Sequence, residues 1–476
     1  MRTELPAIIT ACGLLLAGCA ALPATHNSSE IKPLSRYDSA RSFAAPARSW
    51  PGSAWWKDYG DPQLDQLIRE ALADSPSIAS ARARLQHATA AVAVQRSAWM
   101  PQISANSSTT EQKQSYNYLT PPEITPQGWN DYGRASVDLS WELDFWGKNR
   151  AAVAAATSEA YAVRTDAAQA ALVLSTAVAS AYAELAHQYA QLDTAKSALL
   201  VRTRTAELFR KRLENGLETL GSVRQVEARR AAAEADVLSI EEQIGLQQNR
   251  IAALLGDGPD RGLAITRPVV DLDRPFGLPA QLSLELLGRR PDVVAARLRG
   301  DAAARRIKVA RAAFYPNVNL TAFVGMQAFG LEMLTSHGSL TGSVGPAISL
   351  PIFNGGRLRG QLHGAEADYA EAVANYDRTV VQALQEVADA AVSQKALGAQ
   401  RARTRDAVDA AREAWRIQSN RYDGGLATYL EVLSAEDYLL SNLRALADLQ
   451  ARAFSLDVAL IRALGGGYSN NPSNQP

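Results

Sequence analysis

Two long segments of this chain carry the same sequence pattern, and this duplication constrains the fold more than any other feature. Matching residues around Gly216 and Gly425 lie 209 positions apart, and the same offset relates Gly147 to Gly356. A repeat of about 210 residues is far longer than the roughly 20–50 residue units of solenoid proteins. The chain is therefore a duplicated half-protein, and two similar halves joined in sequence suggest a ring or barrel about a pseudo-symmetry axis.

The N-terminus has the pattern of a secretory signal. Residues 7–17 form an apolar stretch, shorter than the ~20 residues that a helix needs to cross a bilayer. The stretch runs into Leu-Ala-Gly-Cys, which resembles a bacterial lipobox with Cys19 as the lipidated residue. The alternative is an ordinary signal peptide with a chance cysteine. On the lipobox interpretation residues 1–18 are removed, Ala20 favours the outer membrane, and acyl chains that contribute ~0.8 kcal/mol per buried methylene anchor the chain.

The residues that usually carry catalysis or bind metals form no recognisable constellation. The only other cysteine, Cys12, lies inside the signal, so the mature chain has no disulfide and no thiol metal site. The five histidines lack the paired spacing of a zinc motif, and there is no phosphate loop. The net charge is zero, and the basic stretches are balanced by acids elsewhere. The sequence therefore predicts no enzyme, no cofactor, no metal site and no nucleic-acid partner.

Uninterrupted helical sequence fills much of each half. No proline or glycine interrupts residues 151–213, which predict a single helix of roughly 95 Å at ~1.5 Å per residue. Globular helices average only ~11–12 residues. A helix over about 358–421 is its partner in the second half, and return helices over about 222–255 and 431–464 follow. Each half therefore predicts a very long helical hairpin with its tip at the repeated glycine.

Two shorter helices are predicted ahead of the strands, over about 63–98 and 282–313. A coiled-coil rod is the plain alternative for a chain with so much helix. The export signal and the strand pattern between the helices argue against that alternative.

Between each short helix and each long helix the pattern changes to period two. Over residues 137–145, five apolar residues alternate with polar ones, as in a barrel strand with a lipid side and a wet lumen. The acids Asp138, Glu142 and Asp144 are therefore predicted to face the lumen. Other strands are predicted at about 102–112, 316–330 and 344–352. A soluble sandwich shows the same alternation, so the alternation alone leaves both architectures open.

Four strands are too few to enclose an aqueous bore, because single-chain bacterial barrels start at ~8 strands. An open sheet edge in lipid is unstable, since its backbone groups lack hydrogen-bond partners. The strands must therefore close with other copies, and three copies would give twelve strands. The fold class is mixed α and β, with a transmembrane β-barrel continued by a long helical barrel. Residues 111–130, a strand connection with extra residues relative to the second half, are predicted to lie at the cell exterior.

These features together resemble the outer-membrane factor family, the TolC/OprM-like outer membrane efflux proteins, in the lipoprotein branch called NodT-like. The resemblance covers nearly all of the mature chain. The motifs that carry it are Cys19 and residues 55–68, 289–293, 314–316, 353–357 and 421–425. The resemblance implies a homotrimer with a twelve-stranded barrel in the outer membrane and a twelve-helix barrel in the periplasm. Its implied domains are a first repeat with an equatorial linker at 19–280, a second repeat at 281–465 and a disordered tail at 466–476.

The resemblance also implies the activity, which is passive conduction of drugs or other small solutes as the exit duct of a tripartite efflux pump. In the family an inner-membrane pump supplies the energy, and a periplasmic adaptor docks on the hairpin tips. The residues at these tips are Gly216, Leu217, Gly425 and Leu426.

The predicted periplasmic gate consists of Tyr422, Glu431 and Ser434. Tyr422 matches a gate tyrosine of the family, and Glu431 and Ser434 stand where some members have aspartates. Ala427 replaces an arginine that some members use to latch the tip. Glu431 has the alternative interpretation of an ordinary solvated helix residue.

Two other functions remain open from the sequence. The first is the outer-membrane duct of a type I protein secretion system, against which the lipobox and the Trp-Trp segment at residues 55–56 favour efflux. The second is a lipoprotein adaptor or structural coiled coil. An adaptor would have one helical hairpin between split domains, whereas this chain has two hairpins and duplicated strands.

Overall fold

The computed structural model describes residues 30–33, 36–38, 41–117, 121–270, 277–279 and 282–469. These residues divide into two compact units. The first unit, called the strand unit, contains Leu85–Val163 and Ala296–Tyr376. The second, called the hairpin unit, contains Lys32–Arg84, Arg164–Ala295 and the chain from Asp377 onward. Each unit draws on both halves of the sequence, so the units cut across the repeat.

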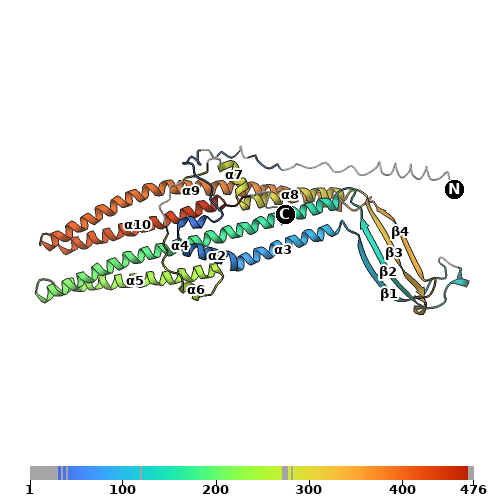
Figure 1. Cartoon of the computed structure of the whole chain (residues 1–476), viewed down its shortest axis with the longest axis horizontal. Coiled ribbons are helices and arrows are strands. Elements are labelled where there is room, and N and C mark those ends of the chain that lie inside the picture. Colours follow the sequence, from blue (N-terminus) through green and yellow to red (C-terminus); the bar gives the residue numbers. More distant parts are fainter. Residues whose placement is uncertain are drawn as a thin grey trace. The chain divides into compact units, whose positions relative to one another are not determined.

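One four-stranded antiparallel sheet forms the strand unit's β-structure, in the order β1-β2-β3-β4 (Figure 1). The two central strands come from different halves of the chain and pair directly with each other. In the described part of the chain, the outer edges of the first and last strands pair with nothing. The strands are β1 (Gln102–Gln112), β2 (Asn130–Glu142), β3 (Asn317–Phe329) and β4 (Leu340–Ser349).

The register of the sheet separates an apolar face from a polar one. Val137 lies opposite Val324 on the apolar face, and Asp138 lies opposite Ser104 on the polar face. The apolar face is open, as Val344 shows with 77% of its surface exposed. A soluble sandwich would cover this face with a second sheet, but the described residues form only this one. Other exposed apolar residues on the same face are Ile103, Val324, Leu340 and Ile348.

The predicted strands at 102–112 and 316–330 are confirmed, and the other two were misplaced at their ends. β2 begins at Asn130 and ends at Glu142, because the chain turns where the Phe145 amide donates to the Leu143 carbonyl at 2.9 Å. Residues 143–145 are therefore not strand residues. β4 ends at Ser349 and contains Pro346, which an edge strand tolerates because its missing N–H can face outward.

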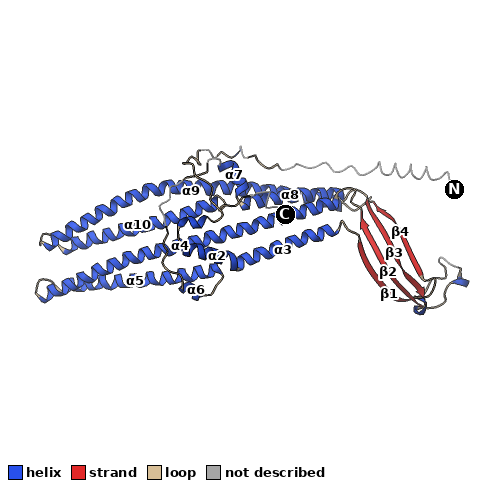
Figure 2. Ribbon diagram, in the orientation of Figure 1, coloured by secondary structure: helices blue, strands red, loops and turns tan. Residues whose placement is uncertain are grey.

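Four helices form the two long hairpins, α4 (Lys148–Glu214) with α5 (Leu220–Leu255), and α9 (Arg357–Asp423) with α10 (Tyr429–Ala463) (Figure 2). The two long helices have 67 residues each, so the predicted hairpins are confirmed. Within the hairpin unit both tips lie at the same end (Figure 1). Glycines 360, 364 and 398 do not interrupt α9. At this length one glycine costs only ~1 kcal/mol against many cooperative backbone bonds.

The prediction of single shorter helices was wrong, because each is broken by a proline. The first is α2 (Pro62–Asp74) followed by α3 (Pro76–Ser97), and the second is α7 (Leu282–Arg289) followed by α8 (Pro291–Ala312). A proline ring clashes with the carbonyl four residues earlier, and it disfavours helix at the residue before it. The residues just before Pro76 and Pro291 therefore end one helix and allow a new one to begin.

The Trp-Trp segment is part of the hairpin unit's core. It forms the short helix η2 (Trp55–Tyr59), in which the two tryptophan rings meet edge to face at 5.7 Å. The Tyr59 ring lies 4.6 Å from Phe454 on α10, centroid to centroid. The segment thus fastens the start of the chain to the second hairpin, and its role is packing.

Candidate gate, docking tips and membrane face

The two hairpin tips have the same backbone design. Gly216 and Gly425 have positive φ values of 71° and 72°, which glycine adopts without a steric penalty. The Leu217 amide donates to the Arg212 carbonyl at 2.8 Å, and the Gly216 amide donates back to Leu213. The second tip repeats both bonds one repeat later. These paired bonds are the Schellman motif, which satisfies the last carbonyls of a helix.

The tips present apolar side chains to solvent. Leu426 is 73% exposed, and Leu217 is nearly as open. Leu220 and Leu430 lie at the start of the return helices and are also exposed. The predicted docking residues thus lie together on each tip as an apolar patch, which is the kind of surface that a protein partner covers.

Tyr422 lies near the end of α9 and joins the two hairpins within one chain. Its ring contacts Tyr429 with centroids 5.3 Å apart, and the Arg212 guanidinium of α4 lies 5.2 Å from its centroid. Tyr429 in turn packs on Phe209 of α4 at 4.4 Å. The Tyr422 hydroxyl is buried and has no hydrogen-bond partner among the described residues. Because the hydroxyl is buried within one chain, a second chain can reach it only if the side chains around it repack.

Burial also affects the ionisation of these two phenols. It raises the pKa of Tyr422 above its ordinary value of 10, although the Arg212 guanidinium acts in the opposite direction. Burial raises the pKa of Tyr429 to about 12. Both rings therefore stay neutral at physiological pH, and the Tyr422 hydroxyl keeps the proton that it would donate.

Glu431 takes part in a capping box at the start of α10. Its carboxylate accepts a hydrogen bond from the Thr428 amide at 2.8 Å, and the Thr428 hydroxyl accepts one from the Glu431 amide. The charge remains exposed to solvent. Ser434 is exposed as well, and its hydroxyl donates to the Leu430 carbonyl at 2.8 Å. Glu431 therefore has a structural role in one chain, and its role as a gate acid stays a prediction.

A buried acid farther along α10 was missed by the sequence interpretation. Glu436 is only 4% exposed, and its carboxylate lies 3.6 Å from the Arg202 guanidinium of α4. Burial raises the pKa of the Glu436 carboxyl, against the lowering effect of Arg202. Beside it, Asp437 forms ion pairs with Arg202 at 3.0 Å and with Arg229 of α5 at 3.2 Å. This cluster ties the second hairpin to both helices of the first.

The repeat explains why Glu436 pairs across the hairpins. Its counterpart Glu227 pairs with Arg210 of its own hairpin at 2.8 Å. The residue matching Arg210 in the second half is Ser419, which offers no charge. Glu436 also follows Leu433 at a three-residue spacing, on the buried side of α10. That spacing was the signal in the sequence that could have identified it.

The three predicted lumen acids have different surroundings. Asp138 lies on the polar face of β2 and accepts a hydrogen bond from the Asn106 side chain at 2.8 Å. Glu142, at the end of the strand, pairs with Lys148 at 2.7 Å. Asp144 lies beyond the strand and caps α4, accepting from the Arg150 amide at 2.8 Å. Of these three acids, only Asp138 lies within the polar face of the strand and forms none of the described ion pairs.

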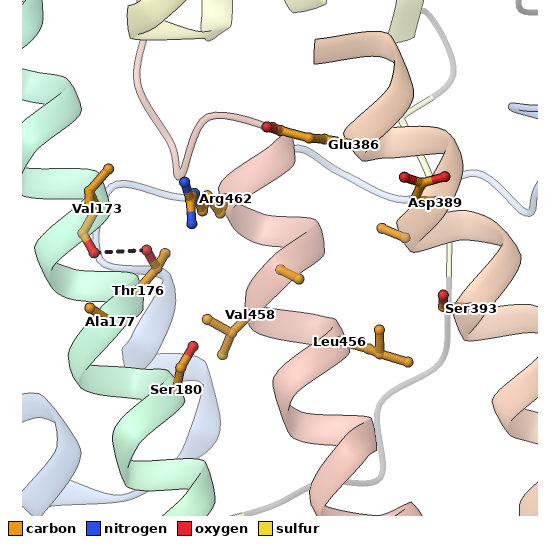
Figure 3. A pocket seen from close by; sticks show the side chains of 12 residues that line it. Val173, Thr176, Ala177, Ser180, Glu386, Asp389, Ser393, Leu456, Val458 and Arg462 are labelled. Carbon is orange, nitrogen blue, oxygen red and sulfur yellow. Dashed lines mark hydrogen bonds between the residues drawn. The ribbon is translucent and has the colours of Figure 1, made fainter. Parts of the chain in front are cut away.

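A cavity of about 440 Å³ lies in the hairpin unit, between α4 of the first hairpin and α9 and α10 of the second (Figure 3). Its walls carry no histidine or cysteine. Glu386, at one side, is already paired with Arg290 at 2.6 Å. The cavity therefore marks a level at which the two hairpins pack incompletely, in contrast to the tip.

Cys19 and the signal sequence lie outside the described residues, as does the tail from residue 470. The equatorial linker is described except for residues 271–276, and it contains the short helix α6 (Pro259–Leu263).

Comparisons with known proteins match both halves of the chain. The sequence profile of the family described as outer membrane efflux protein matches residues 67–257 and 282–466. The fusaric acid resistance protein FusA of Burkholderia cepacia is 42% identical over 369 residues, covering 75% of this chain and 68% of FusA. The multidrug resistance outer membrane protein MdtP of Escherichia coli strain K12 is 30% identical over 469 residues, covering 96% of this chain and 95% of MdtP.

The fold has a close counterpart among solved structures. The crystal structure of the outer membrane protein VceC of Vibrio cholerae matches with a TM-score of 0.83 at 50% identity. The match covers 88% of this chain and 100% of the VceC chain. The arrangement of four strands and two long hairpins is thus that of a known outer membrane protein.

Proposed function

The chain belongs to the outer membrane efflux protein family, and from this premise we propose how it works as the outer-membrane channel of an efflux pump. Three copies join their sheets into one twelve-stranded barrel, and their hairpins continue it into the periplasm. The barrel is a passive duct, because the chain has no nucleotide-binding motif and energy must come from an inner-membrane pump.

One observation carries this proposal, namely the open apolar face of a sheet with two unpaired edges. Exposed apolar side chains on one face suit a sheet that borders lipid. The edges of β1 and β4, unpaired in the described part of the chain, would leave backbone groups unsatisfied in lipid, so each edge needs another strand. Pairing β1 of one copy with β4 of the next satisfies both edges and closes the ring.

The hairpin tips are the proposed gate and docking site. In the trimer the tips repack so that the Tyr422 hydroxyl, buried and unpaired in the described part of one chain, bonds to a neighbouring chain and holds the tips together. Glu431 and Ser434 line the narrowest point, where three exposed carboxylates attract cations. A periplasmic adaptor covers the apolar tips at Leu217 and Leu426, and its docking competes with the closed arrangement.

The barrel lumen is less acidic than its sequence suggested. Glu142 is paired with Lys148, and Asp144 accepts from the Arg150 side chain. Among the described strand residues Asp138 remains, with Arg134 nearby on the same face. The tips, rather than the strands, are therefore the stronger candidates for cation preference.

We place the mature protein at the outer membrane with a lipid on Cys19, as in the NodT-like branch. The lipobox and the apolar stretch before it support this anchor. The proposed halves are residues 19–280, with the equatorial linker, and 281–465, followed by a short tail at 466–476.

The solutes that we propose are drugs and other small molecules. FusA is named for resistance to fusaric acid and MdtP for multidrug resistance. We therefore infer efflux rather than the type I protein secretion that the sequence left open. A passive duct takes its specificity largely from the pump, so the solute class follows the partner pump.

A matched pair of substitutions tests the lipid-facing assignment. Val344 lies on the apolar face of β4, and its neighbour Ser343 lies on the polar face. An arginine at mid-membrane on the lipid side costs ~2–4 kcal/mol, whereas a lumen position tolerates it. Val344→Arg should strongly reduce assembly into outer membranes, and Ser343→Arg should assemble and conduct in planar bilayers. Equal assembly of the two variants would contradict the proposed barrel.

A further inference from the structure

The connection between β3 and β4 folds back over β2. The Gly330 amide donates to the Asp131 carbonyl at 2.9 Å, and the Leu331 amide donates to the Asp131 carboxylate at 2.8 Å. These bonds fasten the short helix η4 (Leu331–Met333) to the end of a strand that is not its neighbour in sequence. The connection therefore has a defined position.

Gly133 shows on which face of the sheet this connection lies. A Cβ at Gly133 would meet the Leu331 side chain at 2.9 Å and the Leu334 side chain at 3.4 Å. Gly133 is four residues before Val137, so it belongs to the apolar face. The missing side chain at this glycine leaves room for the two leucines, which cover the apolar face near its end.

The connection keeps two large apolar side chains exposed. Leu331 is 43% exposed and Met333 is 49% exposed. The segment is held from within, because the Ser339 hydroxyl donates to the Met333 carbonyl at 2.7 Å and the Met333 amide donates to the Gly330 carbonyl at 3.0 Å. A segment that is ordered by these bonds pays little entropy when it binds something.

We propose that this connection, residues 330–339, is a lipid-contact wedge that inserts Leu331 and Met333 among the acyl chains of the outer leaflet. The wedge continues the apolar face on which Leu340 and Val344 are exposed. It rests on the proposed function, which places that face in lipid. The wedge folds toward β2 and away from the β4 edge that another copy would pair with. The wedge therefore contacts lipid rather than a second chain.

The wedge has a physical consequence for the barrel. The outward positions near the end of the sheet include polar residues, such as Asp131 and Glu111. These polar side chains set the outer limit of the apolar band. Leu331 and Leu334 over Gly133 fill the outward position next to Asp131, so the apolar band continues up to that limit and the barrel suits a thicker membrane than it would with Gly133 uncovered.

Site-directed fluorescence tests the wedge. In a background with Cys12→Ser and Cys19→Ser the introduced thiol is the only one in the chain, whether or not the signal is removed. Met333→Cys would carry an environment-sensitive nitrobenzoxadiazole label, in vesicles of outer-membrane lipid extract with and without acyl-chain nitroxide lipid. Val344→Cys serves as the lipid reference, and Lys113→Cys, on an exposed charged residue, serves as the water reference.

We expect the Met333 label to show blue-shifted emission and loss of intensity with nitroxide lipid, as the Val344 label does. Adding Gly133→Ile should displace the connection and shift the Met333 label toward the emission of the Lys113 label. If the Met333 label matches the Lys113 label even with Gly133 intact, while the Val344 label is quenched, the wedge is overturned and the lipid-facing assignment stands. If the Val344 label is also in water, the lipid-facing assignment fails together with the wedge.

Discussion

Removing one hydroxyl at the tip should open the channel. Tyr422→Phe keeps the ring contacts with Tyr429 and Arg212, because these involve the ring and not its oxygen. It deletes a buried hydroxyl that has no partner among the described residues of one chain. If a neighbouring chain supplies that partner in the closed trimer, the variant loses one hydrogen bond at each of three tips.

The size of this effect follows from the energy of a hydrogen bond. One bond contributes a net ~1 kcal/mol, so three contribute ~3 kcal/mol to the closed state. Since 1.4 kcal/mol corresponds to a factor of ten, the ratio of closed to open channels should fall roughly 100-fold. Single channels in planar bilayers, measured at low voltage, should therefore show a much higher open probability.

Tyr438→Phe is the matched control, because Tyr438 is an exposed tyrosine on α10, the return helix of the same hairpin. It should leave the open probability unchanged. An unchanged open probability in Tyr422→Phe, with normal trimer assembly, would refute the inter-chain hydrogen bond. In that case the variant should instead raise the stability of the folded chain by ~1 kcal/mol, because a buried unpaired hydroxyl has been removed.

Three further predictions concern the charges and the anchor. Glu431→Gln keeps the capping box and removes the charge, so it should reduce cation preference in reversal-potential measurements with little change in melting temperature. Glu431→Ala should reduce cation preference and also destabilise the folded protein by ~1 kcal/mol, because the capping box is lost. Equal selectivity of wild type and Glu431→Gln would show that this acid is only a cap. Burial raises the pKa of Glu436, because it disfavours the charged carboxylate. The side chain therefore contributes most to folding stability when it is protonated, and this contribution is lost as pH rises above about 4.5 through the folded pKa. Glu436→Gln should therefore raise the melting temperature at pH 7 more than at pH 4.5, and a pH-independent or negative effect would contradict this reasoning. Cys19→Ser should abolish labelling by radioactive palmitate, while the barrel still inserts, and equal labelling of both proteins would remove the lipobox.

The long hairpins were predictable because their signals are local. A helix without proline and the glycine at each tip need no distant partner to be recognised, and the repeat gives each signal twice. The breaks at Pro76 and Pro291 were local as well, but the helical composition on both sides concealed them. In these places the sequence contained the answer, and the proline rule should have outweighed the composition.

The strand ends and the tip chemistry depended on tertiary partners. The alternation through Phe145 continues after the last ladder bond, and only pairing with β3 decides that β2 ends at Glu142. Glu436 finds its cation on another hairpin, 234 residues earlier in the chain. Glu431 is an intermediate case, because Thr428 and Glu431 have the spacing of a capping box that is readable from the sequence.

The central claim is that three copies close one barrel by pairing β1 with β4 of the next copy. The most direct measurement uses Ala105→Cys on β1 and Val344→Cys on β4 in one chain, again with Cys12→Ser and Cys19→Ser, with a short bismaleimide cross-linker on the membrane-embedded protein. A closed ring predicts a ladder that ends at three chains, and each single-cysteine variant should give far less product. A stable monomer that conducts, or a ladder that continues past three, would contradict the account.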